Sequence, residues 1–129
     1  MNWIKKTGGN WKKKADNVWA EIIKVRAGYR SEFSGKEGKQ IGGKYILNSH
    51  HIVGKPNFTL RYSLENGMCL TSGEHFQLHR NSNYKRKIEK LVSEARWKIL
   101  DELEGVIHKA RYEEKYYELM EIYKSLCGD

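Results

Sequence analysis

The chain of 129 residues is long enough for one domain and too short for two ordinary ones. Its 24 Lys and Arg residues outnumber the 16 Asp and Glu residues, so the formal net charge is +8 and the pI is near 9.5. Hydrophobic residues make up 39% of the chain, which excludes wholesale disorder, and the absence of a run of about 18 apolar residues excludes a transmembrane helix. Two cysteines are too few for a disulfide framework, so we expect a reduced, cytoplasmic protein without membrane partners.

The positive charge is concentrated in the first third of the sequence. Residues 1–47 carry 11 basic and 4 acidic residues, whereas residues 81–129 carry 10 of each. Such a segment is typical of proteins that bind an anionic partner, of which nucleic acid is the commonest. The run Lys12-Lys13-Lys14 is therefore a candidate DNA contact, although a solvated helix face explains the same pattern.

The first half of the chain contains one predicted helix and one predicted strand. Apolar residues at helical spacing predict a helix over about 12–27, with Gly28 as its C-terminal stop. Four glycines between residues 31 and 43 predict a loop. Tyr45 begins a short predicted strand that runs into two adjacent histidines, and a second loop is predicted around residues 54–57.

The second half begins with a turn signal. Asn66-Gly67 predicts a turn, the apolar run 68–70 predicts a second strand, and Thr71-x-x-Glu74 is a capping-box pattern that predicts the start of a helix. From Asn83 to Ile107, apolar residues recur at intervals of three and four and predict continuous helix, and a last helix is predicted from about Glu113. We therefore expect a single α+β domain over 1–129, with a core motif over about 45–80 and a helical extension over about 83–127.

Four of the five histidines lie within 30 residues. His75 and His79 are four residues apart on a predicted helix, so both imidazoles project from one face at a metal-ligand spacing. His50 and His51 are adjacent at the end of a predicted strand, so their side chains point to opposite faces and only one can join the helical pair. A polar residue on a half-buried surface explains each histidine singly, but the cluster predicts a metal site with a separate, unligated histidine beside it.

These residues resemble a known motif. His50-His51, Asn66 and His75-x-x-x-His79 look like the HNH nuclease motif, and the strings HHIVGK (50–55) and LRYSLENG (60–67) are similar to those of phage and prophage HNH endonucleases. The resemblance covers about residues 18–80. It implies a ββα-metal hairpin and helix flanked by an N-terminal helix and long C-terminal helices. It also implies that His50, His75 and His79 bind the metal and that His51 is the general base.

The resemblance implies supporting roles for other residues. Asn66 would hold the hairpin so that the base is correctly aimed, a role compatible with simply fitting an Asn-Gly turn. Arg61 would contact a phosphate or brace the site, and an ordinary surface arginine is the equally weighted alternative. The backbone of the DNA would be gripped by the basic N-terminal helix and by further cations, namely Lys55, Lys85, Arg86 and Lys87.

The chain departs from the family at the structural zinc knuckle. Many members carry two Cys-x-x-Cys pairs, whereas this sequence has Ser31-x-x-Ser34 and Thr71-x-x-Glu74 at the corresponding places. Hydroxyl groups are poor zinc ligands beside thiolates, so no structural zinc is expected. We expect the capping box and helical packing to hold the hairpin instead.

The predicted cofactor is one divalent metal ion. By ligand type, a site of three histidines with open coordination positions suits Mn, Ni or Zn better than Mg. Mg fits when waters and phosphate complete its coordination shell. A neutral histidine can accept the proton of a water that attacks a phosphodiester, since its pKa lies near neutrality. The sequence thus predicts a metal-dependent DNA endonuclease, and the resemblance implies products with a 5′-phosphate and a 3′-hydroxyl.

Two other interpretations remain open. One is a non-catalytic DNA-binding or packaging partner on a degenerate HNH fold, and the other is a zinc-stabilised structural module, against which the missing cysteine pairs argue. For partners the resemblance suggests DNA and, beyond it, phage packaging or recombination proteins. The long C-terminal helices fit either an internal bundle or the seam of a homo-oligomer.

Overall fold

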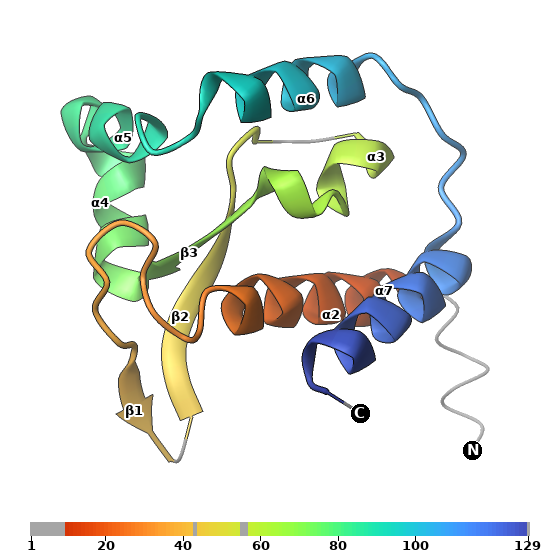
Figure 1. The fold of residues 1–129 in the computed structure, drawn as a ribbon, viewed down its shortest axis with the longest axis horizontal. Helices are drawn as coiled ribbons and strands as arrows, with labels where there is room; N and C mark the ends of the chain where they lie inside the picture. The colour runs from red at the N-terminus through yellow and green to blue at the C-terminus, as the bar shows by residue number, and fades with distance from the viewer. Residues whose placement is uncertain (1–9, 43, 55–56, 129) are drawn as a thin grey trace.

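A small antiparallel sheet with helices on both faces forms the centre of the protein (Figure 1). The computed structural model describes residues 10–42, 44–54 and 57–128. The strands are β1 (Lys39–Ile41), β2 (Lys44–His51) and β3 (Gly67–Thr71), in the order β1-β2-β3. The mixed helix and strand content agrees with the expected α+β class. Within the described residues, no helix is both long and apolar enough to cross a lipid bilayer.

The alternation of side chains along β2 sends consecutive residues into two different layers. Leu47 packs into the core beside α2 (Asn10–Arg26), the Ser49 hydroxyl donates to the Ala20 carbonyl at 2.6 Å, and the His51 ring stacks on Trp19. Asn48 and His50 face the opposite side, toward α4 (Ser72–Arg80). The side chains of the two adjacent histidines therefore point to opposite faces of the sheet, as the two-residue period of a strand requires.

One hydrophobic core lies between the sheet and the pair α2 and α7 (Tyr112–Leu126). These two helices lie side by side although they come from opposite ends of the described chain (Figure 1). The buried members of this core are Ala15, Trp19, Ile22, Ile23, Leu47, Tyr62, Cys69 and Leu119. The aromatic ring of Trp11 also contacts Tyr116, with 5.5 Å between ring centroids. The apolar stripe of α2 predicted from the sequence is thus the face that this core buries.

A second core fills the other side of the sheet. It is covered by α4, α5 (Ser82–Glu89) and α6 (Glu94–Glu104), with the short helix α3 (Phe58–Arg61) packed against α6. Its buried residues are Ile52, Leu60, Met68, Leu70, Leu78, Ile88, Val92 and Leu100. The sheet thus separates two cores, and β2 runs between them.

Several predicted elements are confirmed. The helix over 12–27 is α2, the two strands are β2 and β3, and the last helix is α7. The helix predicted at the capping box is α4, and both halves of the box are formed, because the Thr71 hydroxyl and the Glu74 carboxylate each accept a backbone N–H from the other residue. Gly28 follows α2 with φ of +66°, a conformation that glycine adopts without strain.

Other predictions are wrong in detail. Asn66-Gly67 does not form a hairpin turn, because Asn66 ends the 3-10 helix η1 (Leu64–Asn66) and Gly67 begins β3 with extended dihedrals. The continuous helix predicted from Asn83 to Ile107 is split into α5 and α6, and the Ser93 hydroxyl caps the second of these. The segment over 31–43 that was predicted as a loop contains β1. Of the second predicted loop, residues 55 and 56 lie outside the described residues, and Asn57 caps α3.

Candidate active site

Three histidines from two elements meet beside the sheet. His50 from β2 and His75 and His79 from α4 each offer a ring nitrogen, and these nitrogens lie within 4.8 Å of one another. His50 is buried, His75 is half-buried and His79 is exposed, so the cluster opens from the protein interior to solvent. The spacing of four residues on α4 places the second and third rings on one face, with 4.6 Å between their centroids.

The donor set of this cluster fits a transition-metal ion. The Nε2 atoms of His75 and His79 are 3.1 Å apart, and two nitrogens at that separation can both lie at the ordinary metal–nitrogen distance of about 2.0–2.1 Å from one ion. Burial, followed by the positive potential of the two neighbouring histidines, lowers the pKa of His50 to about 4. Burial also lowers the pKa of His75. These shifts favour the neutral imidazole, which is the form that binds a metal.

The side-chain amide of Asn48 holds the ring of His75. It lies 2.9 Å from Nδ1 of His75, across the gap between β2 and α4. The contacting atom is Nδ2, so as placed the NH2 group donates to Nδ1. With the amide turned by 180°, its oxygen would accept Nδ1–H and the lone pair of His75 would be on Nε2. That arrangement orients a histidine ligand through its second nitrogen. Asn48 is two residues before His50 and therefore shares its face of the strand.

His51 stands beside the cluster but is held separately. Its ring lies parallel to the Trp19 indole, with 4.1 Å between centroids and 3° between planes. Its Nε2 atom is 3.0 Å from the backbone carbonyl oxygen of Arg61. A carbonyl can only accept, so Nε2 carries the proton, and in the neutral ring Nδ1 carries the lone pair. Burial lowers the pKa of His51 more strongly than the Arg61 carbonyl raises it.

The four histidines line one pocket of about 250 Å³. The other lining residues are Ser49, Ile52, Gly54, Leu78 and Lys85. Among the described residues around this pocket, Lys85 is the one with a permanent positive charge, and it projects from α5. The pocket therefore combines three grouped ring nitrogens, one separately held imidazole and one cation, which is a set of groups suited to an anionic substrate.

Asn66 is fully buried and ties three segments together. Its side-chain oxygen accepts the Val53 backbone N–H at 2.7 Å, and its NH2 group donates to the Leu60 carbonyl at 3.2 Å. Its own carbonyl accepts the Ile52 N–H at 2.9 Å. The residue thus fixes the chain where β2 ends after His51. Such contacts suit a positioning residue. Asn66 makes them from the end of a 3-10 helix and not from the predicted turn.

Arg61 points its side chain toward α2. Its guanidinium makes a bidentate ion pair with Asp16, with contacts of 2.8 and 2.6 Å, and the Tyr62 hydroxyl donates to the same carboxylate at 2.8 Å. Burial raises the pKa of Asp16, but the hydrogen bonds from Arg61 and Tyr62 outweigh it, and the net shift is downward. Of the alternatives for Arg61, the contacts favour a brace, because its charge is already paired.

The other expected DNA contacts are spread over the surface. Lys12, Lys13 and Lys14 lie at the start of α2, where Lys14 stands over the Trp11 ring, and none of them lines the histidine pocket. Arg86 and Lys87 are exposed on α5 outside the pocket, and Lys55 lies outside the described residues.

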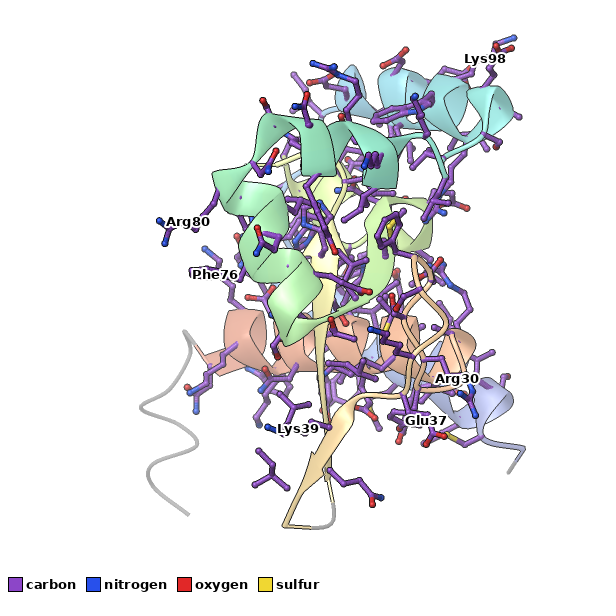
Figure 2. The ribbon with its side chains drawn as sticks, turned by 90° about the vertical axis from the view of Figure 1, so that its left-hand side faces the viewer. Arg30, Glu37, Lys39, Phe76, Arg80 and Lys98 are labelled. Atoms are coloured by element: carbon purple, nitrogen blue, oxygen red, sulfur yellow. The ribbon has the colours of Figure 1, made fainter. Side chains whose placement is uncertain are left out.

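One exposed cation of α4, Arg80, was missed by the sequence analysis and does not line the histidine pocket. Figure 2 shows Phe76 and Arg80 projecting outward from α4, with the guanidinium 5.0 Å from the ring centroid. Arg80 directly follows His79 and is exposed. Its position beside a predicted ligand on the same helix was the available signal, and it adds a positive charge to the helix that carries the histidine pair.

The four residues at the expected zinc-knuckle positions come together without cysteine. The Ser31 hydroxyl donates to the Glu74 carboxylate at 2.5 Å and accepts the Ser34 backbone N–H at 3.1 Å. The same carboxylate accepts the Thr71 N–H at 2.9 Å. This buried network joins the loop after α2 to the start of α4. Hydrogen bonds thus connect the two segments at the place where thiolates are missing.

Two further residues beside the site, Asp16 and Trp19, had no signal in the sequence that linked them to histidines far along the chain. Both lie on α2, three residues apart; Trp19 stacks on His51 of β2, and Asp16 contacts Arg61 and Tyr62. Trp19 was predicted only as a member of the apolar stripe. For Asn48 a signal did exist, since a strand places residues 48 and 50 on the same face.

Comparisons with protein-family models, with curated proteins and with solved structures gave no significant match.

Proposed function

We propose that this protein is a metal-dependent DNA endonuclease of the HNH type. The observation that carries the proposal is the meeting of His50, His75 and His79 in one pocket that His51 also lines. The elements follow in the order β2, β3 and α4, with the first two strands antiparallel, which agrees with the strand–strand–helix order that the sequence resemblance implies.

The three clustered histidines would hold one divalent ion. A bound ion there would stabilise the charge that develops on the phosphoryl and leaving oxygens during hydrolysis. His50 comes from β2 and His75 from α4, and the exposed position of His79 leaves the outer side of the cluster open to substrate. By ligand type, imidazoles favour Mn, Ni or Zn over Mg.

His51 would act as the general base. Its Nε2 proton is held by the Arg61 carbonyl, so Nδ1 would take a proton from the attacking water. The water oxygen forms a bond to phosphorus while the bond from phosphorus to the 3′ oxygen breaks. The leaving oxygen then takes a proton from solvent, which gives a 5′-phosphate and a 3′-hydroxyl. His51 lines the same pocket but is not one of the three grouped histidines, so it stays available for this step.

Lys85 would contact the phosphate that enters the pocket. It is the cation that lines the pocket, whereas Arg86 and Lys87 on the same helix do not. A lysine acts on a phosphate as a point charge and reads no base edge, so this contact favours any DNA sequence equally. The net charge of +8 would add a general, salt-dependent attraction to DNA.

Cleavage of supercoiled plasmid tests the proposal. The purified protein is incubated separately with Mn, Mg, Ni and Zn, with and without EDTA. We expect cleavage that EDTA abolishes and that His51→Ala lowers by about a hundredfold or more. His108→Ala is the matched control, because His108 is exposed and lies outside the pocket, and it should cleave like the wild type.

The outcomes separate the proposal from its alternative. Cleavage that survives EDTA, or a His51→Ala variant as active as the wild type, would contradict the assigned mechanism. DNA binding without cleavage under any metal would favour the non-catalytic DNA-binding partner. Calorimetric titration of the metal-free protein adds an independent measurement, since His79→Ala should weaken metal binding whereas His108→Ala should leave it unchanged.

A further inference from the structure

The carbonyl that holds His51 belongs to a segment with little structure of its own. Arg61 is the last residue of α3, which has only four residues, and a helix of that length is not stable alone in water. After it the chain turns through Tyr62 and Ser63 into η1. The position of the Arg61 carbonyl therefore depends on the contacts that residues 61–63 make with neighbouring elements.

Helix α2 contacts each of these three residues. The Asp16 carboxylate takes two hydrogen bonds from the Arg61 guanidinium and one from the Tyr62 hydroxyl. The Trp19 indole N–H donates to the Ser63 carbonyl at 3.0 Å. A bidentate arginine–carboxylate pair fixes orientation as well as distance, because two parallel bonds resist rotation. Together these contacts hold the segment against one face of α2.

The same helix also fixes the plane of the imidazole. The Trp19 ring is only 2% exposed and lies parallel to the His51 ring at 4.1 Å. Rotation of the His51 imidazole out of this plane would lose the stacking contact together with the hydrogen bond to the Arg61 carbonyl. Trp19 therefore supports the face of the imidazole, while Asp16 supports Arg61, whose carbonyl accepts the hydrogen bond from Nε2–H.

We propose that Asp16 and Trp19 are positioning residues that hold His51 with Nε2 on the Arg61 carbonyl and Nδ1 directed to the reacting water. This assignment rests on the proposed function for the identity of the reaction, but the positioning itself is a property of the protein without metal or DNA. It makes α2, outside the strands and helix that carry the histidines, a part of the site.

The test compares Asp16→Asn with Glu21→Gln. Both changes remove a carboxylate of α2 that accepts a hydrogen bond from a tyrosine, since Glu21 accepts from Tyr29 at 2.5 Å, but only Asp16 contacts the segment that holds His51. The first measurement is the solvent exchange of the His51 Nε2–H proton, followed by NMR in the metal-free protein. The second is single-turnover cleavage of plasmid DNA, and thermal unfolding monitors the fold of each variant.

We expect the His51 Nε2–H proton to exchange about tenfold faster in Asp16→Asn. The maximal single-turnover rate constant should fall about ten- to a hundredfold, with the protein concentration at half-maximal rate nearly unchanged, as misplacement of a reacting group produces. Glu21→Gln should match the wild type in both measurements. Trp19→Phe is a second test, since it removes the bond to Ser63 without touching Arg61, and it should also speed the exchange.

An exchange rate in Asp16→Asn equal to the wild type would overturn the proposal, as would equal effects of Asp16→Asn and Glu21→Gln, which would indicate general loosening of α2. Should Asp16→Asn fail to fold, Trp19→Phe decides by the same criterion. Absence of cleavage by the wild type would count against the proposed nuclease function, and the exchange measurement would still decide whether α2 positions His51.

Discussion

Replacing Gly67 by alanine should destabilise the protein through a steric clash with α2. Gly67 has extended dihedrals, φ −111° and ψ 142°, which any residue adopts, so its backbone alone does not require glycine. A Cβ atom there would lie 2.3 and 2.6 Å from two side-chain carbons of Ile23 and 2.9 Å from Trp19. Ordinary carbon–carbon contacts are about 3.5–4.0 Å, so the neighbours would have to move by about an ångström.

The magnitude follows from the burial of those neighbours. Ile23 is fully buried and Trp19 is 2% exposed, so neither has free space to move into. Overpacking of a filled core costs about 1–3 kcal/mol, and we expect the upper end of that range for Gly67→Ala. For a chain of this size, about 3 kcal/mol corresponds to a fall in Tm of roughly 10 °C.

Urea unfolding of four variants measures the effect. Gly73→Ala is the control, because a Cβ at this helical position meets nothing within 4 Å and should stabilise α4 by up to about 1 kcal/mol. Ile23→Val removes the carbon nearest to the added Cβ, so the double variant Gly67→Ala/Ile23→Val should be less destabilised than the sum of the single changes. A Gly67→Ala protein as stable as the wild type would refute the reasoning.

Three further expectations concern the site and its support. Asn48→Ala should weaken metal binding about 10- to 100-fold by calorimetry, because it removes the group that orients His75, and an unchanged isotherm would exclude that role. Lys85→Gln should slow plasmid cleavage more than Lys87→Gln, since only Lys85 lines the pocket, and equal rates would assign both to general attraction. Burial raises the pKa of Glu74, but hydrogen bonds from Ser31, Ser34 and Thr71 lower it further, to below the ordinary value of 4.5. The Glu74 carboxylate therefore adds stability above about pH 4.5 that is lost as pH falls through its folded pKa, so the wild type should exceed Glu74→Gln in urea stability at pH 7, and this difference should shrink toward pH 3.

Local patterns were sufficient to predict the elements that carry the histidines. The capping box at Thr71 satisfies the backbone of α4 within four residues, and the alternation of a strand separates His50 from His51, so both features are encoded nearby. The spacing of His75 and His79 likewise predicted two rings on one face. These inferences need no knowledge of distant segments.

Contacts between distant segments account for what was not predicted. Asn66-Gly67 has the composition of a tight turn, but Gly67 is required because Ile23 and Trp19 of α2 pack on it. The break between α5 and α6 depends on the Ser93 cap, a signal weaker than the apolar repeat that crosses it. The role of Asp16 is set by Arg61, a residue 45 positions away, and no periodicity connects the two.

The pairing of α2 with α7 joins the first and the last of the described helices to be synthesised. Residues of α2 leave the ribosome first and those of α7 last among the described elements, with the histidines between them. Until Leu119 and its neighbours are synthesised, the face of α2 that they cover is open to water, and elements distant in sequence can pack only after the later one exists. A nascent chain would thus carry the three clustered histidines before α2, which contacts His51, is covered on both sides.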